Sequence, residues 1–453
     1  MPAVEQDLTQ GSVTRKLVRY ALPLVASSLL QAIYSITDII IAGHYIGDVG
    51  ISAINNASII MNMLTQLAIG LTVGGNVLVG QYFGSGDYEN RRKAAGNMLT
   101  VGLIAGLLFA VGILLLGRPL LILLQSPTLE EATAYLSICG VGLLFIFVYN
   151  SLSAILRGVG NSRIPLYCII ASVSLNVVLD ILFVAGFHMG VAGAALATVI
   201  SQGISAAWVL KFLTGRKAIL RLRLRNLALG AGRVKSIVAL GLSGFFMNLT
   251  NSLVQVVCNA TLQAYGGDLY VGVMTIINSL REVFFMPVQG LTNGAQPVTG
   301  YNYGAGRYSR VRSSIRFSVA VTVGYAAVFW AAAMLFPGLL IRVFNSEPEV
   351  VAAGIPALRI YFCLFIPMSL QMAGQGVFVS LGRSKQAVFF SLLRKAIINA
   401  PLTVVLPIWM GTTGVFTAEA ISQLIGGLAC ILTMYFTVYR PLGRLPDRPP
   451  ENI

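Results

Sequence analysis

Charged residues are scarce in this sequence, since Asp, Glu, Lys and Arg together make up only 10% of its 453 residues. Soluble domains contain about 25% charged residues, so this scarcity excludes a soluble globular enzyme. Intrinsic disorder is excluded as well, because it requires low hydrophobicity and 56% of these residues are hydrophobic. The sequence therefore predicts an integral membrane protein.

Histidine, cysteine and nucleotide-binding motifs are equally sparse. The two histidines, His44 and His188, fall in predicted turns, which argues against a His-based metal site. The five cysteines lie inside apolar segments without paired spacing, so we expect neither disulfides nor a metal cluster. The sequence has no G-x-x-x-x-G-K-S/T phosphate loop, which argues against ATP-driven pumping by this chain alone. These absences predict that the protein is not an enzyme.

Long apolar segments make up most of the chain. A membrane-spanning helix needs about 20 apolar residues, and twelve segments of this kind are present. They predict an all-α polytopic membrane protein with twelve transmembrane helices. The expected helices cover residues 16–42, 51–80, 94–117, 132–157, 164–186, 190–213, 235–264, 270–299, 313–337, 353–381, 386–410 and 414–438.

Basic residues outnumber acidic ones, 31 to 16, and they are unevenly distributed among the loops. Alternate loops are rich in Lys and Arg, whereas the only basic residues in the loops between them are Arg118 and Arg342. Because short basic loops stay in the cytoplasm, we expect both termini to be cytoplasmic. The polar start of the chain lacks the features of a cleaved signal peptide and predicts a retained tail. Since the charge is a topology signal, no nucleic-acid partner is expected.

The two halves of the chain are copies of one unit. Three glycine-containing motifs of the first half recur in the second half at offsets of 220, 222 and 221 residues. Six helices per copy is an even number, so both copies enter the membrane in the same direction, as in carriers built from parallel repeats. The matched motifs begin at Gly80 and Gly300, at Gly160 and Gly382, and at Gly193 and Gly414.

A basic segment joins the two copies. The predicted organisation is an N-lobe at residues 1–213, a basic cytoplasmic linker at 214–234, a C-lobe at 235–440 and a cytoplasmic tail at 441–453. The charge of the linker is interpreted as a topology signal on a flexible tether. Binding of anionic lipid or nucleic acid is the alternative interpretation.

Two acidic residues, Asp38 and Asp180, lie inside apolar segments of the N-lobe at similar expected depth. An ionisable group inside the membrane is costly and therefore predicts a functional site. Asn176 lies one helical turn from Asp180 on the same face, and Thr198 of the sixth segment is expected at the same level. Oxygen ligands of this kind suit a proton or a hard cation such as Na⁺, so the four residues predict a coupling-ion site. For both aspartates, a hydrogen bond to a neighbouring helix without titration is the alternative.

Two further intramembrane acids, Glu282 and Glu419, belong to the C-lobe. They are predicted to offer negative potential to cationic substrates in a cavity, with Arg281 beside Glu282. A fixed structural ion pair is the alternative for each acid, and Arg394 and Lys395 are the expected balancing cations.

The repeat alignment separates the two lobes chemically. Glu419 occupies the position that Thr198 holds in the N-lobe. Cys258 and Leu402 fall opposite Asp38 and Asp180, at offsets of 220 and 222. The lobes are therefore predicted to share a scaffold, with the coupling-ion chemistry mainly in the N-lobe.

At these residues the chain resembles the multidrug and toxic compound extrusion (MATE) transporters. Matching features cover nearly its whole length and comprise the two six-helix lobes, Asp38, Asn176-x-x-x-Asp180 followed by Gly186, Gly193 to Gln202, and the Gly-rich ends of the second and eighth segments. The run from Gly294 to Ala305 is similar to the bacterial MepA-like branch.

This resemblance implies a function. Members of the family export amphipathic, often cationic compounds by antiport against H⁺ or Na⁺ through alternating access. It implies small drug-like substrates, no cofactor beyond the coupling ion, and a monomer in the bacterial cytoplasmic (inner) membrane. By position, Asp38, Asn176, Asp180 and Thr198 match the family's first-lobe ion site.

Other branches of the family carry additional acids in the seventh and tenth helices. Here Asn251, Gln255 and Gln371 stand at such positions without charge, which argues against a second-lobe Na⁺ site of that type. Asn251 and Gln255 are instead predicted to join Glu282, Glu419 and Arg281 along the substrate cavity.

Three other functions compete with drug efflux. A lipid-linked or polysaccharide flippase shares a two-lobe plan, although such proteins often have extra helices and many cavity cations. A channel or receptor would have no need for acids concentrated in one lobe. An intramembrane aspartyl hydrolase is disfavoured because neither Asp38 nor Asp180 stands in a Gly-x-Gly-Asp context.

Overall fold

The computed structural model describes residues 11–123, 127–215, 218, 220–222 and 224–448. Within these ranges, the side chains of residues 32–33, 35–36, 38–40, 42–43, 48, 51, 224–225, 240 and 243–249 lie outside the described part. The predicted site residue Asp38 is among them. Its backbone belongs to a helix.

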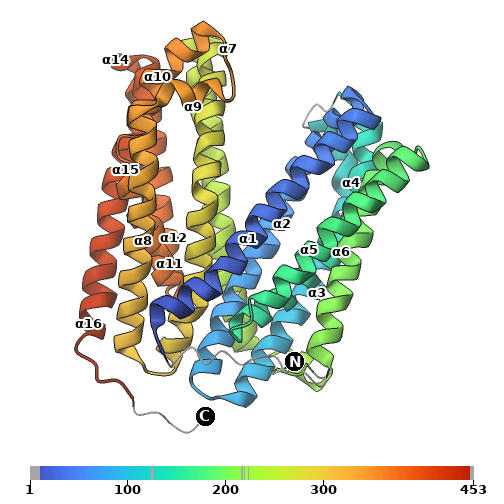
Figure 1. Cartoon of the computed structure of the whole chain (residues 1–453), viewed down its shortest axis with the longest axis vertical. Coiled ribbons are helices and arrows are strands. Elements are labelled where there is room, and N and C mark those ends of the chain that lie inside the picture. The colour runs from blue at the N-terminus through green and yellow to red at the C-terminus, as the bar shows by residue number, and fades with distance from the viewer. Residues whose placement is uncertain (1–10, 124–126, 216–217, 219, 223, 449–453) are drawn as a thin grey trace. The chain divides into compact units, whose positions relative to one another are not determined.

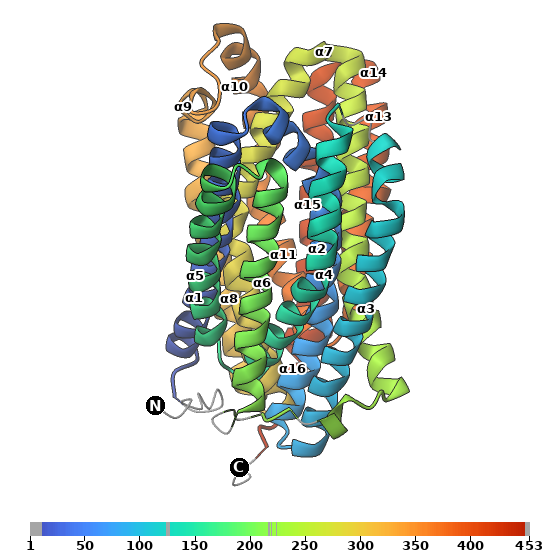
Figure 2. The same ribbon diagram turned by 90° about the vertical axis from the view of Figure 1, so that its right-hand side faces the viewer.

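The first half of the described chain forms helices joined by short turns (Figure 1). Within it, α4 packs against α2, α3 and α6 (Figure 1 and Figure 2). The elements are α1 (Val13–Tyr45), α2 (Asp48–Gly84), α3 (Tyr88–Leu123), α4 (Leu129–Gly158), α5 (Arg163–Asp180), the π-helix η1 (Ile181–Gly186), α6 (Gly190–Thr214) and the 3₁₀ turn η2 (Leu224–Leu227).

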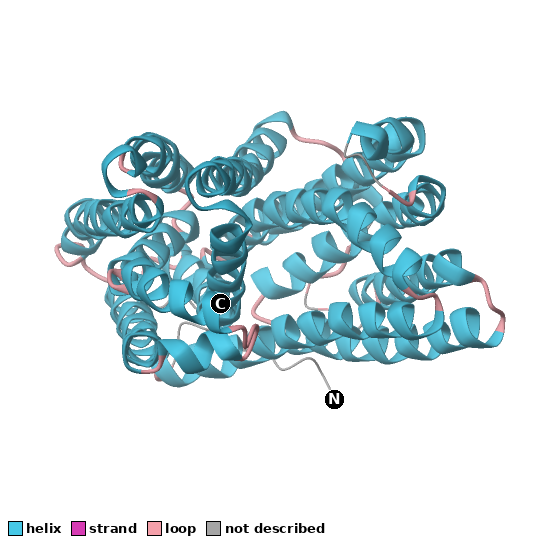
Figure 3. Cartoon of the chain, turned by 90° about the horizontal axis from the view of Figure 1, so that it is seen from above, coloured by secondary structure: helices cyan, strands magenta, loops and turns pink. Residues whose placement is uncertain are grey.

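The second half is also helical, and every described residue in Figure 3 belongs to a helix, a loop or a turn. α7 (Ala231–Gly304) consists of two helices joined at a kink at Gly267. The elements that follow are α8 (Tyr308–Leu335), α9 (Pro337–Arg342), α10 (Pro348–Phe362), α11 (Phe365–Ser380), α12 (Ser384–Leu392), the π-helix η3 (Leu393–Asn399), α13 (Ala400–Val405), α14 (Pro407–Met410), α15 (Thr412–Met434), the π-helix η4 (Tyr435–Tyr439) and α16 (Arg440–Leu442).

The helices have the length and composition of membrane spans. Among the described residues, 9 helices are long and apolar enough to cross a membrane, and the bent pair α10 and α11 forms one more such span. The segment Thr250–Gly304 of α7 counts once among the 9 but is divided into two helices at Gly267, so it adds one span, and α1, with 33 residues, is the twelfth. Large apolar side chains such as Leu108 and Leu115 of α3 point outward, as they do where a helix faces lipid. The predicted all-α, polytopic fold class is confirmed.

The chain divides into two compact units. Of the described residues, 22–244 form the first unit, and 11–21 together with 245–448 form the second. The start of α1 belongs to the second unit because Leu17 and Ala21 pack with Ala295. The predicted linker at 214–234 lies within the first unit. The predicted lobe boundaries at 213 and 235 differ from this division in these two places.

The internal repeat is visible in the backbone. Four glycines of the first unit have positive φ angles, and each has a counterpart with positive φ in the second unit. Such angles mark the tight turns that only glycine adopts easily. The pairs are Gly47 and Gly267, Gly86 and Gly306, Gly160 and Gly382, and Gly190 and Gly411, at offsets of 220, 220, 222 and 221.

The linker is not a free tether between Asn226 and Gly230. The side chain of Asn97 on α3 donates to Ala228 O at 2.9 Å and accepts from Gly230 N at 2.7 Å. A Cβ added at Gly96 would lie 1.9 Å from Asn226 O, so the linker backbone is in direct contact with α3. The expectation of a flexible linker is wrong for this stretch, because a buried asparagine satisfies its backbone groups.

Candidate functional site

Two polar residues of the first unit are buried near the end of α5. Asn176 is fully buried and Asp180 is 1% exposed. They are four residues apart and therefore lie on one face of the helix. The helix continues directly into the π-helix η1, which begins at Ile181. π-helical turns inside α-helices are rare and often occur at functional sites.

α1 and α6 add hydroxyl groups to this unit. Tyr34 OH on α1 donates a hydrogen bond to Thr198 Oγ1 on α6 at 3.1 Å. Ser172 Oγ on α5 donates to Ser201 O on α6 at 3.2 Å, which joins these two helices near Thr198. Tyr34 was not predicted from the sequence. Its position one helical turn before Asp38 was the available signal.

The described side chains of this first site are a carboxylate, a carboxamide and two hydroxyls. All present oxygen atoms, the ligands that hard cations prefer. A carboxylate at membrane depth also requires a counter-charge or a proton, because an isolated buried charge is costly. The arrangement can hold a proton or a small hard cation.

In the second unit, Glu419 on α15 forms a buried ion-pair cluster. Its side chain is 3% exposed, and Lys395 Nζ lies 3.0 Å from Oε1 and 3.2 Å from Oε2. Arg394 Nη1 lies 3.8 Å from Oε1. Asn399 donates a hydrogen bond to Oε2. This geometry favours the fixed ion pair over an open negative wall of a cavity, since both carboxylate oxygens are already bonded.

Glu282 has a different environment on α7. Its side chain is 65% exposed, and its carboxylate lies 3.1 Å from Arg281 Nη2. Arg281 also donates to Tyr361 OH at 3.2 Å. Farther along the unit, Asn251 is exposed and Gln255 is half-buried on the first part of α7. Of the two acids predicted to line a substrate cavity, Glu282 is therefore the accessible one.

The π-helix η3 changes the alignment of the repeats. Gly160 and Gly382, which precede the fifth span of each unit, differ by 222. η3 inserts an extra residue into the second unit, so beyond it the offset becomes 223. Asn399 then aligns with Asn176, and Thr403 aligns with Asp180. The sequence prediction that placed Leu402 opposite Asp180 is wrong by one residue.

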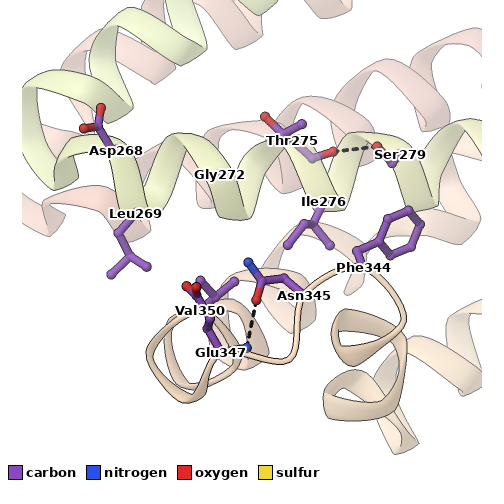
Figure 4. A pocket seen from close by; sticks show the side chains of 10 residues that line it. All are labelled: Asp268, Leu269, Gly272, Thr275, Ile276, Ser279, Phe344, Asn345, Glu347 and Val350. Atoms are coloured by element: carbon purple, nitrogen blue, oxygen red, sulfur yellow. Dashed lines mark hydrogen bonds between the residues drawn. The ribbon is translucent and has the colours of Figure 1, made fainter. Parts of the chain in front are cut away.

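A surface hollow occurs elsewhere in the second unit, between α7 and the turn before α10 (Figure 4). Its volume is about 560 Å³, and Asp268, Thr275, Asn345 and Glu347 contribute polar groups to its lining. None of the predicted site residues lines this hollow. In the described part of the chain, no three His, Cys, Asp or Glu side chains are grouped as metal ligands.

Comparison with known proteins assigns the chain to a family. The family model MatE matches residues 23–182 and 244–405, which is one match in each unit. The chain belongs to the MatE family. The family resemblance noted in the sequence is thereby confirmed, and the two matches follow the internal repeat.

Relatives of this MatE chain are similar along almost their full length. A probable multidrug resistance protein, YpnP of Bacillus subtilis, is 28% identical over 94% of this chain and 96% of its own. The multidrug export protein MepA of Staphylococcus haemolyticus is 24% identical over 96% of this chain and 95% of its own.

Solved structures share the MatE fold. A MATE crystal structure in the bent conformation matches with a TM-score of 0.92 at 21% identity, covering 98% of this chain and 99% of that one. A MOP superfamily transporter from Pyrococcus furiosus matches with a TM-score of 0.89 at 21% identity, covering 98% of this chain and 100% of that one. At this identity, the likeness shows the fold alone.

Proposed function

We propose that this MatE-family protein is a secondary active multidrug efflux transporter that exports amphipathic, cationic compounds by antiport with H⁺ or Na⁺. Two relatives that match nearly its full length are named for multidrug resistance or export. The observation that carries the coupling role is the burial of Asp180 and Asn176 on one face of a membrane-spanning helix. A carboxylate in that position needs a proton or cation whenever it is sealed from water.

The proposed cycle follows from this requirement. The coupling site comprises Asp38, Asn176, Asp180 and Thr198, and it releases its proton or cation to the cytoplasm and reloads from outside. Tyr34 holds Thr198 in place through its hydrogen bond. Because the loaded and unloaded sites differ in charge, each favours a different conformation, which couples ion entry to substrate export by alternating access.

We place the substrate near Glu282, whose exposed carboxylate attracts cationic compounds. Arg281 beside Glu282 and, on the first part of α7, Asn251 and Gln255 are further candidates, and Glu419 is retained as an indirect contributor of charge. The protein is proposed to act as a monomer in the bacterial cytoplasmic membrane, with both termini inside and no cofactor beyond the coupling ion.

Transport into proteoliposomes tests this proposal. An imposed pH or Na⁺ gradient should drive ethidium uphill with the unaltered chain, and Asp180→Asn should abolish that accumulation. Asp268→Asn is the matched control, because Asp268 is exposed at the turn of α7. Uphill ethidium transport by Asp180→Asn would contradict the coupling role. Movement of lipid-linked sugars without any ion-driven ethidium transport would favour the flippase instead.

A further inference from the structure

The second unit contains a continuous chain of polar contacts that ends at Glu419. Cys258 Sγ lies 3.8 Å from Thr403 Oγ1. Thr403 Oγ1 donates to Asn399 Oδ1 at 3.1 Å, and Asn399 donates to Glu419 Oε2. All four side chains are buried. The chain of contacts runs across α7, α13, η3 and α15 within one unit.

These four residues are the repeat counterparts of the proposed coupling site. Cys258 aligns with Asp38 at an offset of 220, and Glu419 aligns with Thr198 at 221. Beyond η3, Asn399 and Thr403 align with Asn176 and Asp180 at 223. The second unit therefore has a group of polar residues at the equivalent place. Its carboxylate lies on α15, whereas the carboxylates of the first unit lie on the first and fifth spans.

A covalently attached cation fills this second site. Lys395 is buried, and its ammonium group contacts both oxygens of Glu419. An ammonium group has three N–H donors and no acceptor, so it presents a full positive charge to the carboxylate. The first-unit residues that align with Lys395, counted from either side of η3, are Ser172 and Val173. Neither carries a charge.

We propose that Lys395 is an internal cation that takes, in the second unit, the place a coupling cation takes in the first. This inference rests on the proposed coupling site. A buried carboxylate must be neutralised, and here a side chain that cannot dissociate supplies the charge. The second unit consequently does not take up the coupling cation, and ion binding is confined to one site per chain. Arg394 adds a second fixed positive charge 3.8 Å from Glu419 Oε1.

The test removes the internal cation and asks whether a free one replaces it. The background is Asp180→Asn, which silences the first site. Arg394→Met with Lys395→Met then leaves Glu419 without its fixed cations. The melting temperature of this triple variant in detergent should rise by about 2 °C or more when Na⁺ replaces choline at equal ionic strength. The background variant should show no such rise.

Two controls assign the effect to Glu419. Adding Glu419→Gln to the triple variant should abolish the Na⁺ response. Lys93→Met, which breaks the exposed ion pair with Glu89 on α3, should leave the background unresponsive to Na⁺. No response to Na⁺ or Li⁺ in the folded variant, or a response to pH alone, would overturn the proposal.

Two further measurements keep the proposal falsifiable if the triple variant does not fold. In the Asp180→Asn background, Lys395→Met without the change at Arg394 should give a smaller Na⁺ response, since Arg394 remains near Glu419. Saturable ²²Na⁺ binding that persists in Asp180→Asn and disappears on adding Glu419→Gln would show that the second unit binds cations despite Lys395, and would overturn the proposal. All these readouts omit substrate and transport, so their failure is distinguishable from failure of the transport test.

Discussion

The fifth span of each unit contains a π-helix, but the two differ in position and in the chemistry beside them. In the first unit, η1 follows Asp180, whereas in the second unit η3 precedes Asn399 and carries Arg394 and Lys395. One unit therefore presents a buried acid with oxygen ligands, and the other holds its acid in fixed ion pairs. Two units with the same succession of spans therefore contain electrostatically different sites.

The third span of each unit is covered by a different segment. In the first unit, Asn97 of α3 binds the backbone of the linker. Its counterpart at an offset of 220 is Phe317 of α8, which packs against the cluster of Leu17, Ala21 and Ala295. At this position the first unit has a polar residue that binds the linker, and the second unit has an aromatic residue that packs against the start of α1.

The N-terminus of that span is also capped in two ways. Asp87 precedes α3, and its carboxylate accepts from Asn90 N at 3.0 Å. The second unit has Arg307 at the aligned position, and Asp447 of the C-terminal tail replaces the cap by accepting from Ser309 N at 2.9 Å. The tail thus supplies the cap that Arg307, at the start of α8, does not provide.

The largest expected contrast lies between Asp180 and its counterpart Thr403. Asp180→Asn should abolish uphill ethidium transport, because the coupling site loses its titratable group. Thr403→Val should retain transport, since it removes hydroxyl contacts to Asn399 and Cys258 but no titratable group. Initial rates in proteoliposomes under an imposed ion gradient measure both. Equal losses in the two variants would show that the units contribute alike.

Substitutions at the aligned positions Glu419 and Thr198 should change the free energy of unfolding by very different amounts. Glu419→Gln leaves Lys395 and Arg394 buried without their carboxylate and should lower the free energy of unfolding by about 3–5 kcal/mol. Thr198→Val loses the hydrogen bond from Tyr34 and should cost about 1 kcal/mol. Denaturant titrations of both variants in detergent would measure the difference. A small effect of Glu419→Gln would exclude a tight buried pair.

The docked linker predicts an intermediate effect. Asn97→Ala should destabilise the first unit by about 1–3 kcal/mol, because Ala228 O and Gly230 N lose their partner. Asn150→Ala on α4 is the control, since the Asn150 side chain donates within its own helix, to Ile146 O. Thermal unfolding and proteolysis at the linker would report the change. A linker that is cleaved no faster in Asn97→Ala would contradict this docking.

The smallest effects are expected at the two caps. Hydrogen bonds from Asn90 lower the pKa of Asp87, and those from Ser309 lower the pKa of Asp447 against the opposing effect of partial burial. A lowered pKa adds stability above the ordinary value of 3.8 that is lost as the pH falls through the folded value. Asp87→Ala and Asp447→Ala should each cost about 1 kcal/mol at neutral pH. Thermal unfolding at acidic pH should show the same stability for each variant and the unaltered chain, because the carboxylates are then protonated.

The amino-acid sequence determined the spans, the repeat and most of the candidate acids. The length of an apolar segment, a turn glycine and an isolated charge within an apolar segment are local properties, so they can be recognised from the sequence. Asp180 and Asn176 were found in this way, and the structure places both in the interior of the first unit. The side chain of Asp38 lies outside the described residues, so its part in the site stays a prediction.

Tertiary structure alone decided the register and the partners. A π-helix adds one residue to a helix without a sequence signature, so the match of Thr403 with Asp180 required the backbone. Lys395 and Glu419 are 24 residues apart in the chain, and only packing of η3 against α15 shows that they pair. The docked linker was equally hidden, because its bonds to Asn97 use backbone groups that every residue possesses.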